Sequence, residues 1–97
     1  MPSSLENGLP RLAAHARLRD DPLTGALLLL YPEGVLQLDE TAAEIARRCD
    51  GLRTVDAIVA ELADAFDGDR DEIARDVAEC LRDLQDRGLV RLDFSAP

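Results

Sequence analysis

The sequence has few of the residues from which catalytic and metal sites are built. Its 97 residues include one histidine, two cysteines and no tryptophan. It also lacks a glycine-rich phosphate loop, a Gly-x-Ser-x-Gly motif and a His-Glu-x-x-His motif. His15 could serve as a general acid or a metal ligand only if other side chains converged on it, which a sequence cannot show. Cys49 and Cys80 lie on apolar helical stripes rather than in a Cys-x-x-Cys pair. We therefore predict a protein that is not an enzyme and that carries no metal or cofactor.

The chain also lacks lysine, a long hydrophobic run and a signal-peptide pattern. All eleven basic residues are arginines, against twenty acidic residues, and the formal net charge is -9. Because a phosphate backbone is bound through clustered positive charge, this balance argues against nucleic acid as a partner. No apolar segment approaches the ~20 residues of a membrane helix, so we expect a reduced protein in the cytoplasm, without a membrane partner.

Length and composition predict one small domain. A chain of this size buries only about 60 to 65% of its unfolded surface, which leaves few apolar positions for a deep substrate cavity. Residues 1–11 contain prolines, serines and a glycine and are predicted to form a flexible lead-in. Residues 12–97 are predicted to form the single domain.

The first half of the domain has the pattern of short strands. Residues 15–19 alternate loosely, residues 20–25 supply turn residues, and residues 26–31 form an apolar run that ends at Pro32. A further short strand is expected at residues 35–38. This pattern predicts a three-stranded antiparallel meander.

The hydrophobic period changes to 3.6 residues after Leu38. Asp39 and Thr41 are both candidate N-caps for a first helix, Thr41 with Glu44 fits a capping box, and Gly51 suits the helix end.

Two more helices follow in the same pattern. The second begins at Thr54 and carries an apolar face through Phe66, and the third follows Asp69 and ends before Gly88. Strands followed by helices predict an α+β fold, in which three helices pack on one face of a three-stranded antiparallel sheet.

Two surfaces of this predicted fold could bind a partner. Leu28 and Leu30 face the opposite side of the sheet from Leu27, Leu29 and Tyr31, and helices cover only one side. The other side should therefore expose an apolar patch, which either binds a partner or is covered by the lead-in.

The second surface is the last strand of the meander. If strand order follows chain order, residues 35–38 lie at an edge with unpaired backbone groups. Extended peptides bind such edges by adding a strand.

Several short segments, spread over nearly the whole chain, carry a resemblance to a known family. They are residues 10–12, 27–32, 38–45 and 49–55, Ile58, Leu62, Leu81, Leu84 and residues 88–90. In this order and spacing they resemble the pyrroloquinoline quinone biosynthesis protein D (PqqD) family. The resemblance implies a winged-helix-like fold of a three-stranded sheet followed by three helices.

The resemblance also implies a function. The family provides peptide-recognition domains (RiPP recognition elements) for ribosomally made, modified peptides, and its members bind the precursor peptide PqqA and present it to the radical S-adenosylmethionine enzyme PqqE. The peptide is expected along the third strand and the third helix, and the acidic balance suits a basic peptide. The expected peptide-binding residues are Val35, Leu36, Gln37, Leu38, Asp76, Cys80, Asp83, Leu84 and Arg87.

Two other function classes share this layout. One is an acidic protein-interaction adaptor, and the other is a winged-helix DNA-binding domain that reads bases with its third helix. That helix carries more acidic than basic residues, whereas a DNA-reading helix should carry a basic excess.

The apolar second strand and the loop at residues 20–25 also allow the amino-terminal hairpin to exchange between two chains. We therefore expect a weak or hairpin-exchanged homodimer at high concentration, with the monomer as the peptide-binding form.

Overall fold

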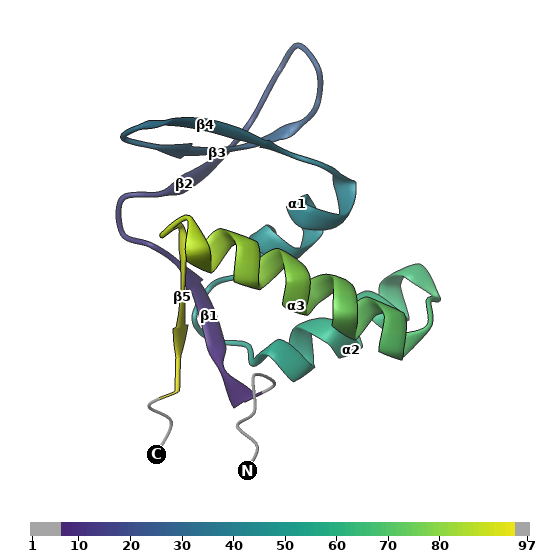
Figure 1. The fold of residues 1–97 in the computed structure, drawn as a ribbon. Helices are drawn as coiled ribbons and strands as arrows, with labels where there is room; N and C mark the ends of the chain where they lie inside the picture. Colours follow the sequence, from purple (N-terminus) through teal and green to yellow (C-terminus); the bar gives the residue numbers. More distant parts are fainter. Residues whose placement is uncertain (1–6, 95–97) are drawn as a thin grey trace.

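The computed structural model describes residues 7–94, with three helices on one side of a three-stranded sheet and a two-stranded ribbon beside the helices (Figure 1). The predicted α+β fold is confirmed. The elements follow in the order β1 (Leu9–Leu12), β2 (Arg17–Asp20), β3 (Leu27–Tyr31), β4 (Gly34–Leu38), α1 (Glu40–Arg47), α2 (Val55–Phe66), α3 (Arg70–Asp86) and β5 (Val90–Asp93).

The three-stranded sheet is the predicted meander, in the order β2-β3-β4. All its pairs are antiparallel, and a turn of two residues, Pro32 and Glu33, joins β3 to β4. β2 begins at Arg17, later than predicted, because the chain turns just before it. In that turn the N–H of Ala16 donates to the carbonyl of Ala13 at 2.9 Å, and His15 lies within the turn.

The core lies between this sheet and the helices. From the sheet, Leu27, Leu29 and Leu38 point into it and are 3%, 0% and 6% exposed. The helices contribute the residues that their 3.6-residue period predicted, and the largest fully buried side chains among these are Ile45, Ile58, Val77, Leu81 and Leu84. Leu28 and Leu30 lie on the other face of β3 and are half-buried.

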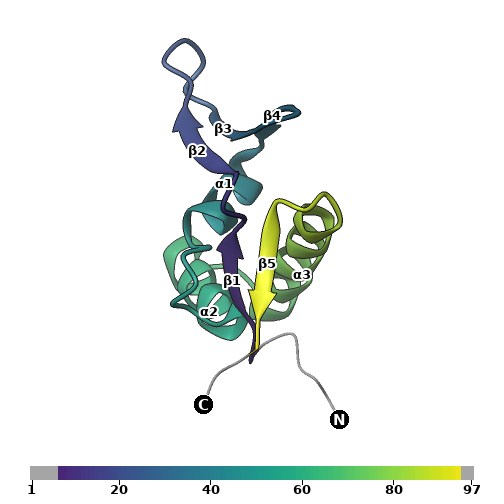
Figure 2. The ribbon, with the colours of Figure 1, turned by 90° about the vertical axis from the view of Figure 1, so that its left-hand side faces the viewer.

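The ribbon of β1 and β5 was not predicted. β1 pairs antiparallel with β5, so the two ends of the described chain lie side by side (Figure 2). On its other edge, β1 contacts the segment between α1 and α2, where Gly51 N–H donates to the Pro10 carbonyl and Val55 N–H donates to the Gly8 carbonyl, both at 2.9 Å. Four residues that include a proline carry too little periodicity to show this pairing.

Part of the predicted lead-in therefore belongs to the folded structure. Residues 9–11 lie in β1, and residues 1–6 lie outside the described residues.

The helix starts follow local sequence, with one correction. Thr54 and Asp69 cap α2 and α3 as predicted. For α1 the cap is Asp39, whose carboxylate accepts from the N–H of Ala42 at 2.8 Å. Thr41 then falls inside the first turn, so the predicted capping box is wrong.

The end of α1 is also earlier than predicted. The helix ends at Arg47, and Cys49 follows it as a buried loop residue. Gly51 has a positive φ of 79°, but it lies in the loop beside Arg11 rather than at the helix end. The helix stops early because this loop must turn to meet β1.

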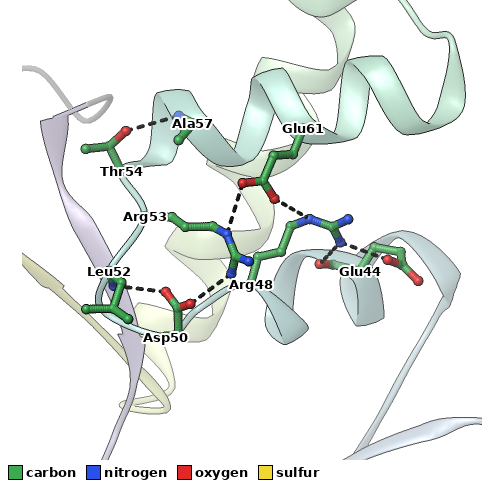
Figure 3. A network of polar contacts seen from close by, with 8 residues as sticks. All are labelled: Glu44, Arg48, Asp50, Leu52, Arg53, Thr54, Ala57 and Glu61. Carbon is green, nitrogen blue, oxygen red and sulfur yellow. Dashed lines mark hydrogen bonds and ion pairs between the residues drawn. The ribbon is translucent and has the colours of Figure 1, made fainter.

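A network of charges fixes the same loop to α2 (Figure 3). Arg48 contacts Glu44 at 2.8 Å and Glu61 at 3.1 Å, while Arg53 contacts Glu61 at 3.0 Å and Asp50 at 2.9 Å. The network therefore links α1, the loop and α2 through one shared carboxylate, that of Glu61.

Asp50 also shapes the loop directly. Its carboxylate accepts from the N–H of Leu52 at 2.9 Å. This bond, with the charge of Arg53, holds the pKa of Asp50 below its ordinary value. The segment at residues 49–55 thus has a structural role as the second neighbour of β1.

The two faces of β3 predict different costs for the same substitution. Leu29→Ala should lower the free energy of unfolding by about 3 kcal/mol, because a fully buried leucine leaves a cavity. Leu28→Ala, the matched change on the half-buried face, should cost less than about 1 kcal/mol. Urea denaturation of both variants measures the difference, and equal costs would contradict the assignment of the core face.

Candidate functional site

β4 forms an open edge of the sheet. It pairs only with β3, as the sequence predicted. Because the turn before β4 has two residues, Tyr31 and Gly34 form a hydrogen-bonded pair. In an antiparallel ladder such pairs alternate with pairs that are not hydrogen-bonded, so the backbone N–H and C=O groups of Leu36 and Leu38 also point toward β3. The backbone N–H and C=O groups of Val35 and Gln37 therefore point away from the sheet and can pair with an added strand.

This edge differs from the other strand edges in its side chains. β4 contains no charged residue, whereas three of the four residues of β2 are charged and β5 contains Arg91 and Asp93. Charged residues on an edge strand oppose pairing with another chain. Among the described strands, β4 is thus the one whose open edge has no such protection.

A groove begins where β4 ends. It runs between the start of α1 and the middle of α3. We call it the acidic groove; its lining residues are Asp39, Thr41, Ala42, Asp76, Glu79, Cys80 and Asp83. Four of these seven side chains are carboxylates and none is basic, so the groove has a negative potential.

An apolar hollow continues from the acidic groove and shares Thr41 and Asp76 with it. Its other lining residues are Glu40, Glu44, Leu62, Phe66, Ile73 and Val77. Phe66 was predicted on the buried face of α2, but it is 55% exposed. The groove and the hollow together form one depression that is acidic at one end and more apolar at the other.

The structure places the predicted site residues in four positions. Val35, Leu36 and Gln37 lie on β4, and Asp76, Cys80 and Asp83 line the acidic groove. Leu38 and Leu84 are 6% and 2% exposed, so they belong to the core beneath the site rather than to its surface.

Arg87 occupies the fourth position. It is exposed at the end of α3, where its Nε donates to Asp83 at 3.2 Å. It can therefore orient Asp83, four residues earlier on the helix.

Sequence reasoning missed four residues of the groove: Asp39, Thr41, Ala42 and Glu79. Glu79 could have been found from its position beside Cys80 on the third helix. The other three come from the start of α1, and only the packing of α1 against α3 brings them to the site.

Both cysteines lie in surroundings that disfavour a thiolate. Burial raises the pKa of Cys80 to about 11, and the carboxylates of Asp39 and Asp83 add to the effect. Burial raises the pKa of Cys49 to about 12, with smaller contributions from Cys80 and Asp50. Neither thiol is activated for nucleophilic chemistry.

Within residues 7–94, no three or more His, Cys, Asp or Glu side chains are arranged to hold a metal ion. No helix in the same range is long and apolar enough to cross a membrane. What the site presents is a strand edge beside a groove, which is a geometry for binding an extended chain.

Comparison with known proteins agrees with this geometry. The family model for "Coenzyme PQQ synthesis protein D (PqqD)" matches residues 26–90. This chain belongs to the PqqD family. A "PqqA binding protein" of Rhodopseudomonas palustris (strain BisB5) is 44% identical over 93 residues, which are 95% of this chain and 91% of the relative. The resemblance identified in the sequence is thereby confirmed.

Two solved PqqD structures share the fold. The solution structure of the PqqD part of Methylobacterium extorquens PqqCD, described as a functional, stand-alone RiPP recognition element, has a TM-score of 0.78 at 31% identity and covers 91% of this chain and 93% of that chain. The crystal structure of PqqD from Xanthomonas campestris has a TM-score of 0.59 at 40% identity and covers 84% and 90%. The relative with the higher identity thus superimposes less closely.

The raised pKa values predict slow reaction of both cysteines with a thiol reagent. At pH 8 the native protein should react far more slowly with Ellman's reagent than the unfolded chain, whose thiols have a pKa of about 8.5. The native rate should rise as pH approaches 11, the value to which the pKa of Cys80 is raised. Fast reaction of the native protein at pH 8 would contradict this assignment.

The raised pKa values of Cys49 and Cys80 also predict how the free energy of unfolding changes with pH. The unfolded chain loses its thiol protons first, so the free energy of unfolding should decrease as pH rises from about 8.5 toward the native pKa values. In a Cys49→Ala, Cys80→Ala double variant this part of the decrease should be absent.

Proposed function

We propose that this protein binds the precursor peptide PqqA in the cytoplasm as a non-catalytic chaperone and presents it to the radical S-adenosylmethionine enzyme PqqE. Relatives in the family carry the name PqqA binding protein, and the Methylobacterium extorquens domain is described as a RiPP recognition element. The observation that carries the proposal is the uncharged open edge of β4 beside the acidic groove.

The peptide binds by adding a strand to β4. Its backbone pairs with the outward N–H and C=O groups of Val35 and Gln37, and these bonds do not depend on the peptide's side chains. Selectivity then comes from the groove, where Asp76, Cys80 and Asp83 face alternate side chains of the bound segment. Leu38 and Leu84 support this surface from the core.

The charge of the groove selects the peptide's chemistry. Four carboxylates around one groove favour a segment that carries a basic side chain or its amino terminus, and they disfavour a phosphate backbone. This distribution argues against the DNA-binding alternative, because it places negative charge on the helix that would read the bases.

A pair of substitutions at one position tests strand addition. Gln37→Pro removes an outward N–H without removing a bond to β3, so the protein should stay folded while the peptide affinity falls roughly tenfold, the loss of one backbone hydrogen bond to the peptide. Gln37→Ala keeps the N–H and should change the affinity less than about threefold. Calorimetric titration with PqqA measures both.

Equal affinities of a folded Gln37→Pro variant and the wild type would contradict strand addition at β4. Thermal unfolding, followed by circular dichroism, confirms that the variant is folded.

The expected homodimer concerns the same sheet. Hairpin exchange would move the strands that carry Leu27 and Leu29 onto a neighbour's helices, where every core contact can form again. We propose that the monomer binds the peptide and that exchange occurs at high concentration.

Sedimentation over a wide concentration range, with and without PqqA, tests this equilibrium. The dimer fraction should rise with protein concentration and fall when the peptide is added, because exchange and peptide compete for the sheet. A dimer that persists at the lowest concentration and binds peptide without dissociating would overturn the proposal and place the peptide site at the dimer interface.

A further inference from the structure

The sheet has a second face whose chemistry differs from that of the acidic groove. Its strands place one set of side chains on the side away from the helices, because residues paired across strands share a face. We call this set the outer sheet face. It consists of Arg17, Arg19, Leu28, Leu30, Val35 and Gln37.

Nothing in the described chain covers this face. Figure 1 shows the three helices on the opposite side of the sheet, and β1 lies beside the helices rather than on the outer sheet face. Val35, on the outer surface of β4, is 58% exposed. Of the two explanations that the sequence left open, cover by the lead-in thus receives no support from residues 7–11, which belong to or adjoin β1.

The loop between β2 and β3 extends the apolar surface. Figures 1 and 2 both show it projecting beyond the sheet on the side away from the helices. Its tip residue, Leu23, is 92% exposed. The loop is nevertheless held in one shape, because Asp21 accepts from the Leu23 N–H and from the Thr24 hydroxyl, each at 3.0 Å. Leu23 is therefore exposed to solvent at the tip of an ordered loop.

The charge of the outer sheet face is positive in an acidic protein. Arg17 and Arg19 are exposed, and neither belongs to an ion pair among residues 7–94. Arg19 contributes only slightly to the lowered pKa of Asp21, which results mainly from the hydrogen bonds donated by Leu23 and Thr24. No acidic residue belongs to the outer sheet face itself.

We propose that the outer sheet face, together with Leu23, docks an acidic and partly apolar patch of the enzyme that modifies the bound peptide. This inference rests on the proposed function. The outer sheet face combines apolar side chains with Arg17 and Arg19, which form no ion pair among residues 7–94. It is therefore complementary to a surface of carboxylates and apolar groups.

The position of the face explains why the partner is that enzyme. Val35 and Gln37 direct their side chains to the outer sheet face and their backbone groups to the open edge, so a protein on the face lies beside the added strand. The peptide uses the backbone edge and the groove on the helix side, which leaves the face free. Opposite charges on the two surfaces keep the two partners from exchanging places.

A charge reversal tests the docking surface, with purified PqqE as the probe. Arg17→Glu, Arg19→Glu should weaken PqqE binding at least about tenfold at low salt, and added salt should weaken the wild-type complex while changing the variant's little. The control is Arg75→Glu, Arg82→Glu, which makes the same charge change at two exposed arginines of α3 outside the acidic groove. This control should bind PqqE as the wild type does.

Peptide binding is measured separately on each protein. All of them should bind PqqA within about twofold of the wild type, since neither pair touches the edge or the groove. Failure of the wild type to bind PqqA would refute the proposed function, whereas a selective loss of PqqE binding in the first variant would still support docking. Leu23→Ser, a change at a side chain that is 92% exposed, gives a second variant that should fold and should also weaken PqqE binding.

Two results would overturn the inference. The first is wild-type affinity for PqqE in a folded Arg17→Glu, Arg19→Glu variant. The second is a wild-type dimer, seen by sedimentation, that this variant dissociates, because the face would then bind a second copy of the chain.

Discussion

The structure depends on the burial of Leu27 and Leu29 between the sheet and the helices. These two side chains fix β3 at the centre of the sheet with one face inward. If β3 slipped by one residue, the inward-facing side chains of the strand would turn to solvent, so its register is strongly specified. Because only three strands are present, a central β3 leaves β2 and β4 as edges. The site, the groove and the outer sheet face all follow from that arrangement.

The two edges of the sheet differ in charge, and so do its two faces. Arginines and an aspartate occupy β2, while β4 carries no charge. Carboxylates line the groove on the helix side, and arginines accompany leucines on the outer sheet face. A domain of this size has too little interior for a deep pocket, so strand edges, grooves and sheet faces are the surfaces that it offers for binding. The proposed sites for the peptide and for the enzyme then lie side by side.

Much of the fold could be predicted because its signals are local. The apolar run at residues 26–31 and the caps Thr54 and Asp69 act within a few residues of themselves, and the structure has them where expected. The first helix shows the limit of such signals. Asp39 and Thr41 are both good caps two positions apart, and the extended backbone of Asp39 decides between them.

The sequence by itself determined the order of the strands and helices of the sheet domain and the core leucines, because periodicity and capping are properties of neighbouring residues. Only the tertiary structure decided the pairing of β1 with β5 and the meeting of α1 with α3, which brings Asp39 beside Cys80 and Asp83. These contacts join segments far apart in the chain, and no short pattern records which distant segment a residue will meet. Packing of the helices against one another and against the sheet makes that choice.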